Sequence, residues 1–182
     1  MHLQSGNIAL RAVEPSDSDL LYQWENDIAL WWVSDRLAPV SKFEIEQFIL
    51  NSSEVRHQSQ IRLMVELNEN HSTKTIGTVD IYDFDLYHSR AGVGIFIIEE
   101  LRQKGYAKTA VRLAETYCFD TLGLHQLYAI VGGHNIHSMR LFTKLGYRET
   151  GTRTDWYHTS DGYENQHCFQ KTIFEFQQLK TR

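Results

Sequence analysis

The chain has 182 residues, two cysteines and a formal net charge of −5. A chain of this length can bury one substantial core, and no Pro-, Gly- or Ser-rich stretch divides it, so we expect a single domain over 1–182. The acidic balance argues against non-specific nucleic-acid binding and favours cationic ligands. Two distant cysteines exclude a disulfide framework and a four-cysteine zinc site, which suits reduced thiols in a cytoplasmic protein.

The N-terminal third predicts one strand and two helices. Residues 8–13 alternate weakly, as in an edge strand, and Pro15-Ser16 then opens a helix that continues through Trp24. Ser41 and Glu44 form a capping box for a second helix, which ends at the polar 51–53. The start of the chain has no export signal and no segment is long and apolar enough to span a bilayer, so we expect no membrane partner.

The remaining two thirds predict a mixed sheet with further helices. Residues 61–67 and 75–84 form a hairpin around 68–72, and the apolar run 93–98 is a central strand. A helix over 109–121 stops at Gly123, a strand covers 126–131, and a short helix over 138–145 is closed by Gly146. Strands at about 147–157 and 164–174 flank the turn 159–162. This order favours a mixed sheet with helices on both faces.

The segment RQKGYA, residues 102–107, lies between the apolar run 93–98 and the amphipathic helix. A strand, a turn of small residues and a helix N-terminus together make a phosphate cradle, because the first helical amides are unpaired and the helix dipole is positive there. A Walker-type loop is excluded, since Gly105 is followed by Tyr106 and Ala107 rather than by Lys and Ser or Thr.

The same segment resembles the acetyl-CoA signature of the GCN5-related N-acetyltransferase (GNAT) family: Arg or Gln, two residues, Gly, one residue, then Gly or Ala. About thirty residues later, 135–147 resembles the second landmark of that family, an Asn followed by a helix that ends in Lys-Leu-Gly-aromatic. The resemblance extends over essentially the whole chain. It implies an α/β fold of the α+β type, with a mixed, mostly antiparallel sheet of about seven strands that splays between two central parallel strands.

The resemblance also implies acetyl-CoA as co-substrate. By similarity, backbone groups at the end of the apolar strand pair with pantetheine, the signature holds the pyrophosphate, and the Asn landmark and its helix lie near the sulfur. The cofactor residues expected on this basis are Phe96, Ile97, Ile98, Arg102, Gln103, Lys104, Gly105, Tyr106, Ala107, Asn135, Ser138 and Phe142.

The catalytic groups are harder to assign, because the chain departs from its relatives at two positions. Phe142 stands at the position where many members of that family have a helix tyrosine that donates a proton. Gly92 stands where they often have a strand glutamate that acts as base. Ser138 matches the serine of ribosomal-protein N-terminal acetyltransferases, and we predict it as the proton donor; a plain helix-cap role is the alternative. Tyr147 or Tyr157 are other candidate donors.

Acidic and aromatic residues predict the acceptor site. Asp80 matches an acidic strand position that contacts the amine in polyamine enzymes, and we predict that it orients the amine or relays its proton; the alternative is a solvent-facing carboxylate. Other acids and tryptophans fit either an acceptor slot or ordinary surface and core positions. The residues predicted to bind substrate are Glu25, Trp31, Asp80 and Asp83, with Asp27, Asp35, Asp85, Trp24 and Trp32 nearby in the sequence.

The leading hypothesis is therefore an acetyl-CoA-dependent N-acetyltransferase in which a primary amine attacks directly in a ternary complex. Its acceptor is expected to be a small cationic amine such as a polyamine. Two alternatives stay open: a protein N-terminal acetyltransferase, favoured by Ser138 and Phe142, and a CoA-binding module without catalysis, favoured by Gly92 and Phe142. No metal is expected, because His134 and His137 lack further ligands at a suitable spacing. Homo-oligomers are expected by analogy alone.

Overall fold

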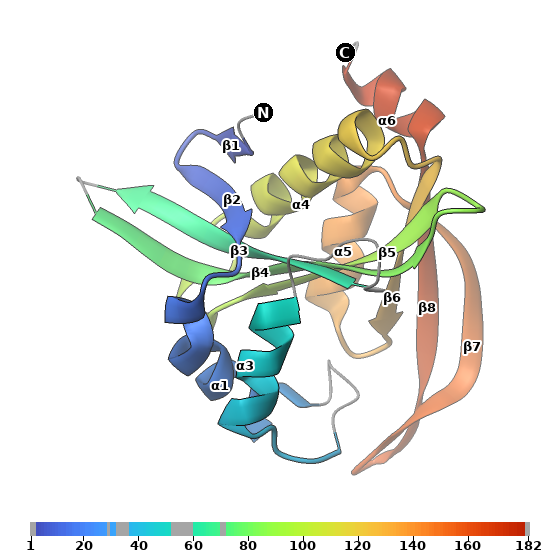
Figure 1. Cartoon of the computed structure of the whole chain (residues 1–182). Coiled ribbons are helices and arrows are strands. Elements are labelled where there is room, and N and C mark those ends of the chain that lie inside the picture. The colour runs from blue at the N-terminus through green and yellow to red at the C-terminus, as the bar shows by residue number, and fades with distance from the viewer. Residues whose placement is uncertain (1–2, 29, 32–36, 52–59, 70–71, 181–182) are drawn as a thin grey trace.

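Eight strands form one sheet in the order β1-β2-β3-β4-β5-β6-β8-β7 in the computed structural model (Figure 1), which describes residues 3–180 apart from 29, 32–36, 52–59 and 70–71. The predicted mixed sheet is confirmed, and the two-residue β1 extends the expected set of about seven strands. The strands are β1 (Gln4–Ser5), β2 (Ile8–Ala12), β3 (Gln60–Glu69), β4 (Ser72–Asp85), β5 (Arg90–Ile97), β6 (Gln126–Gly132), β7 (Arg148–Thr159) and β8 (Gly162–Thr172).

Helices cover both faces of the sheet, with α1 and α3 on one face and α4 and α5 on the other (Figure 1). The predicted capping box at α3 is confirmed, because the Glu44 amide donates to Ser41 Oγ at 3.1 Å and the Ser41 amide donates to Glu44 Oε2 at 2.7 Å. The helical segments are η1 (Pro15–Asp17), α1 (Ser18–Glu25), α3 (Lys42–Asn51), η2 (Glu99–Leu101), α4 (Tyr106–Thr116), the π-helical turn η3 (Tyr117–Thr121), α5 (Ile136–Leu145) and α6 (Ile173–Lys180).

Two boundaries differ from the sequence prediction. Helix α4 begins at Tyr106, three residues earlier than expected, so the glycine turn is itself the helix cap. The final strand ends at Thr172, and the chain continues as α6 rather than as strand. Side-chain capping stabilises this helix start, because Glu175 Oε2 accepts from both the amide and the hydroxyl of Thr172, at 2.7 and 3.0 Å.

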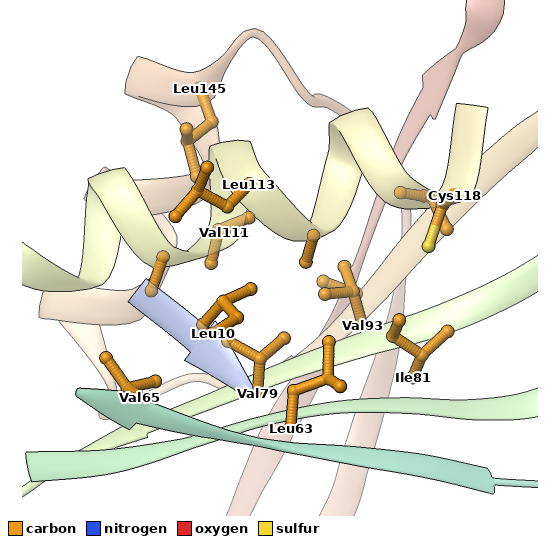
Figure 2. Packing of buried hydrophobic residues seen from close by; sticks show 14 of the residues in the cluster. Leu10, Leu63, Val65, Val79, Ile81, Val93, Val111, Leu113, Cys118 and Leu145 are labelled. Atoms are coloured by element: carbon orange, nitrogen blue, oxygen red, sulfur yellow. The ribbon is translucent and has the colours of Figure 1, made fainter. Parts of the chain in front are cut away.

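The main core lies between the sheet and α4, as Figure 2 shows. Every second residue of a strand points into this core, so Val79 and Ile81 of β4 are buried against α4. The residues between and beside them, Thr78, Asp80 and Tyr82, point to the opposite face of the sheet. A smaller cluster covers that opposite face, where fully buried Met64 contacts residues from α1 and α3. We call this second side, between the sheet and α1 and α3, the acceptor face.

A buried ion pair fixes α4 and α5 relative to β8. Lys171 Nζ donates to Glu115 Oε1 at 2.9 Å and to the carbonyl of Leu145, the last residue of α5, at 2.8 Å. Both charged side chains are only 2% exposed. Burial raises the pKa of Glu115, and Lys171 opposes that shift. The pair thus holds together the two helices whose N-termini border the site described next.

The central strands β5 and β6 are parallel and pair only over 90–92 with 126–128. Beyond those residues β5 continues to Ile97 along β4, and β6 continues to Gly132 along β8. Residues 93–97 and 129–132 therefore face one another without pairing. We call this divergence the V; it confirms the splay expected between two central parallel strands.

Candidate active site

The turn before α4 presents backbone amides at the open end of the V. Gln103 and Gly105 have φ angles of +62° and +88°, and this left-handed pair turns the chain sharply into the helix. A Cβ at Gly105 would meet no atom within 4 Å, so the space beside the turn is open. Since the first amides of a helix have no partner within it, this turn fits a diphosphate.

The signature arginine has a structural contact as well. Arg102 Nε donates to the carbonyl of Ile97 at 2.9 Å, which joins the turn to the end of β5. Residues 102–105 are exposed, and Tyr106 and Ala107 are half-buried at the start of α4. The Tyr106 hydroxyl donates to Glu69 Oε1 at 3.4 Å, so its side chain leans toward the end of β3.

The edge of β5 is only partly available to pantetheine. The Ile98 amide donates to the Ile76 carbonyl at 2.9 Å and is therefore committed to β4. The Ile97 carbonyl accepts from Arg102. Because amide direction alternates along a strand, the amides of Ile95 and Ile97 face the V. Ile95 is a residue that the sequence prediction missed, whereas Ile98 is not placed to pair through its amide.

The Asn landmark caps α5. Asn135 Oδ1 accepts from the Ser138 amide at 3.1 Å, so the capping role belongs to Asn135. Ser138 is half-buried in the first turn, and its hydroxyl has no hydrogen-bond partner among the described residues. This leaves the predicted donor hydroxyl available to a ligand.

Phe142, predicted beside the cofactor, lies in the core. Its ring is 2% exposed and packs 5.1 Å from the ring of Tyr147 and 6.3 Å from that of Phe169. A phenyl ring has no hydroxyl to leave exposed, so burial in the apolar cluster is its most stable place. Tyr147 is 3% exposed in the same cluster, and burial raises its pKa well above the ordinary value. Neither ring is accessible to substrate.

On the acceptor face, Arg62 joins two of the predicted substrate residues. Its Nε donates to Asp80 Oδ1 at 2.6 Å, and its Nη1 donates to Glu25 Oε1. The three side chains are 14 to 19% exposed, and the Arg62 guanidinium also stacks 5.1 Å from the Phe48 ring. Burial opposes the charged form of Arg62, but Asp80 and Glu25 outweigh it and raise its pKa above the ordinary value.

This cluster changes the interpretation of Asp80. The carboxylate also accepts from Gln60 Nε2 at 2.8 Å, so it is held by neighbours rather than solvated. Two carboxylates against one guanidinium leave the Glu25–Arg62–Asp80 cluster with a formal charge of −1. A half-buried site of this charge attracts a cation. The sequence prediction missed Arg62, because an arginine on an alternating strand carries no local sign of its partners.

The other predicted substrate residues are spread over a wider area. Trp31 Nε1 donates to the Glu25 carbonyl at 3.0 Å, and Trp24 of α1 packs edge-on against Phe96 of β5 at 5.1 Å. Asp83 lies at a bulge with φ of +50° and accepts from the Tyr128 hydroxyl at 3.0 Å. Asp83 is exposed. Trp32 and Asp35 lie outside the described residues.

Gly92 has no room for the glutamate of the relatives. A Cβ there would lie 2.3 Å from Tyr82 Cε2 and 2.4 Å from Cζ. The aromatic ring thus occupies the space above this strand position. Tyr82, like Ile95 and Arg62, is a residue that the sequence prediction missed.

His134 lies in the loop between β6 and α5 and contacts Glu164 through Nδ1. It is 42% exposed in its side chain, in keeping with the predicted surface or loop position. Among the residues that the structure describes, no group of three or more His, Cys, Asp or Glu side chains could hold a metal ion. Both cysteines are free, and burial raises the pKa of the Cys118 thiol to about 12.

Comparison with known proteins identifies the family of the chain. Residues 7–148 match the family described as "Acetyltransferase (GNAT) domain", which is most of the chain. The fold and the cradle define an acyl-CoA-dependent type of transferase, and this match shows that the chain belongs to the GNAT family of acetyltransferases. The expected N-acetyltransferase class and the family resemblance are both confirmed.

Individual relatives share the whole length of the chain. It is 28% identical over 175 residues to the spermidine N(1)-acetyltransferase of Escherichia coli (strain K12), covering 95% of this chain and 89% of that protein. It is 24% identical to the SPbeta prophage-derived uncharacterized N-acetyltransferase YokL of Bacillus subtilis, and this match covers 94% of this chain and 93% of that protein. The crystal structure of spermidine N-acetyltransferase from Vibrio cholerae, in complex with CoA and spermine, superposes with a TM-score of 0.84 at 22% sequence identity. This superposition covers 95% of this chain and 99% of that one. Within the described residues, no helix has the length and apolar character to cross a bilayer.

Proposed function

We propose that the protein transfers an acetyl group from acetyl-CoA to a small cationic amine, most readily a polyamine. The observation that carries this proposal is the half-buried Glu25–Arg62–Asp80 cluster, whose two carboxylates exceed its one guanidinium on the face beside β5. An ammonium group placed there is attracted by the residual negative charge. The spermidine acetyltransferases among the relatives support this acceptor class.

The donor half would bind acetyl-CoA mainly through backbone groups. Amides of the turn 102–107 suit the diphosphate, and the amides of Ile95 and Ile97 suit the amide groups of pantetheine. Ser138, with its hydroxyl available at the start of α5, lies at the other side of the V. Acetyl-CoA bound in this way supplies an activated thioester carbonyl; the chain's own residues position it and manage the protons.

The acceptor half would orient the amine for direct attack in a ternary complex. Gly94 pairs with Asp80 across β4 and β5, and a Cβ at Gly94 would make only ordinary contacts, at 3.8 Å. The space above Gly94 is therefore bordered by Asp80 on β4 and by the rings of Trp24 and Phe96. An ammonium there can be held by the carboxylate and by cation–π attraction to the rings.

One alternative acceptor has an observation in its favour. Ser138 and Phe142 match the residues of ribosomal-protein N-terminal acetyltransferases in the resemblance described above, and a peptide N-terminus is also an amine. The edge of β7, whose residues are mostly exposed, offers backbone groups to an extended peptide. The polyamine proposal is favoured because the acidic cluster is half-buried, which suits a small compact cation.

A thiol-release assay tests the proposal. Acetyl-CoA is mixed with the protein and with spermidine, spermine, an aminoglycoside or peptides with a free N-terminus, and release of CoA thiol is followed. The proposal predicts saturable release with the polyamines and little with the peptides. Release with peptides alone would support the alternative acceptor. Measurable CoA binding without release by any amine would show a binding module instead.

Two further expectations stay proposals. A spermidine N-acetyltransferase structure of Vibrio cholerae is described as dodecameric, which supports self-association of this chain, and light scattering of the purified protein tests it. A cytoplasmic location is the simplest reading of two free cysteines, and fluorescent tagging in cells tests that.

A further inference from the structure

Tyr82 crosses from β4 over β5 on the acceptor face. It pairs with Gly92 in the antiparallel register, and its ring lies directly above that glycine, as the 2.3 Å approach of an added Cβ to Cε2 shows. An added Cβ at Gly94 would lie 3.8 Å from Tyr82 Cε1, so the ring borders both glycines. Because Gly92 and Gly94 have no side chains, the Tyr82 ring has room to extend across β5 toward β6.

The hydroxyl of Tyr82 reaches the apex of the V. The backbone amide of Ile130 on β6, two residues beyond the last paired residue, Tyr128, lies close enough to this oxygen to lower the pKa of the phenol, against the larger effect of burial. The Tyr82 and Tyr128 rings meet edge-on at 5.9 Å and 85°, which fixes the ring plane. The phenol thus spans from β4 to β6 at the point where the two parallel strands separate.

The chemistry of this phenol is that of a proton donor. Among the described residues the Tyr82 hydroxyl has no hydrogen-bond acceptor, so its proton is available for donation. Burial raises the pKa of Tyr82, and the neighbouring Tyr128, Asp83 and Tyr157 raise it further. The group is therefore neutral at ordinary pH and unsuited to act as a resting base.

We propose that Tyr82 is a catalytic proton donor of the acetyl transfer, taking the place of the helix tyrosine that Phe142 lacks. The proposal rests on the proposed function. The amine lone pair forms the C–N bond to the thioester carbon and the C–S bond breaks. The Tyr82 O–H gives its proton to the departing sulfur, and the proton that the nitrogen must lose returns to the Tyr82 oxygen. No oxidant or further reactant is needed.

The test is Tyr82→Phe, with Tyr87→Phe as matched control. Tyr87 is 90% exposed in the turn after β4 and loses the same single hydroxyl. General acid catalysis contributes about 100-fold or more, so kcat of Tyr82→Phe is expected to fall about 100-fold while the KM for the amine changes little. Tyr87→Phe is expected to keep the wild-type kcat.

A binding cycle provides a readout that does not depend on turnover. The dissociation constants of CoA and desulfo-CoA are measured by calorimetry for wild type and for Tyr82→Phe. A hydrogen bond from the phenol to sulfur predicts that wild type prefers CoA by about 3- to 10-fold. The variant is expected to bind the two ligands equally, with a melting temperature close to that of the control.

The outcomes separate this proposal from the proposed function. Wild-type turnover with an unchanged kcat in Tyr82→Phe, or an equal preference for CoA in both proteins, would overturn the role of Tyr82 alone. Loss of CoA binding in the variant would also overturn it, by showing a structural role. Absence of turnover in wild type with every amine would overturn the proposed function, and the donor role with it.

Discussion

The proposed donor and acceptor halves of the site are built in different ways. The donor half uses backbone amides of one short segment, the turn before α4, together with the edge of β5. The acceptor half uses side chains from α1, β3 and β4, brought together in the Glu25–Arg62–Asp80 cluster. Backbone chemistry depends on local conformation, whereas side-chain clusters depend on long-range pairing. The donor half thus depends on one short stretch of sequence, and the acceptor half on residues that lie far apart in it.

The largest expected effect comes from removing the cation of the acceptor half. Arg62→Met leaves the Glu25 and Asp80 carboxylates half-buried without their counter-charge, and we expect the free energy of unfolding to fall by about 3–5 kcal/mol. Urea denaturation measures it. Lys42→Met is the control, because its ion pair with Asp19 is exposed and is expected to contribute far less to the free energy of unfolding. Equal losses in both variants would mean that the cluster is not a structural unit.

A second change acts on the donor half alone. Gly105→Glu places an anion at the open turn, and we expect CoA affinity to fall by about 100-fold or more through charge repulsion. Gly123→Glu is the matched control, since Gly123 also has a positive φ, +67°, and an added Cβ there also meets no atom within 4 Å. Calorimetry with CoA measures both. Unchanged affinity in Gly105→Glu would place the diphosphate elsewhere.

A third change is expected to weaken binding of the amine without affecting binding of CoA. Asp80→Asn removes one negative charge but keeps a side chain that can bond to Gln60, and we expect the KM for spermidine to rise about tenfold. CoA affinity should stay the same, because the carboxylate faces away from the turn before α4. Asp161→Asn, in an exposed turn, serves as control. A rise in CoA dissociation constant without a change in amine KM would reverse the assignment of the two halves.

The smallest expected effect concerns Asp17, which lies directly before α1, the helix that carries Glu25. Burial raises the pKa of Asp17, but hydrogen bonds from Arg11 and from the Glu14 amide outweigh it and lower the pKa. A carboxyl of lowered pKa adds stability above its unfolded pKa, about 3.9, and loses it as pH falls through the folded value. Asp17→Asn should thus lower the free energy of unfolding by about 1 kcal/mol at pH 7.

The pH dependence of that difference is the check. Urea denaturation across the acid range should show the gap between wild type and Asp17→Asn narrowing as pH falls below about 4. Asp19→Asn, at an exposed neighbouring position, is the control for the loss of a surface carboxylate. A gap that stays constant with pH would mean that the charge of Asp17 contributes nothing.

The difference between the two halves also decides what the sequence could predict. The turn at 102–107 follows from its small residues between a predicted strand and a predicted helix. The splayed strands and the Asn135 landmark come instead from the family resemblance. Arg62 and Tyr82 carry no such signal, because their partners lie 18 or more positions away or on another strand. Phe142 is predicted at the cofactor by resemblance, and the structure buries its side chain in the apolar cluster.

The most direct test of acetyl transfer from the donor half to an amine at the acceptor half is an initial-rate study. Thiol release is measured while acetyl-CoA and spermidine are both varied. Direct attack in a ternary complex predicts saturation by both substrates and intersecting double-reciprocal lines. Parallel lines, which indicate an acetylated enzyme, or the absence of thiol release would contradict it.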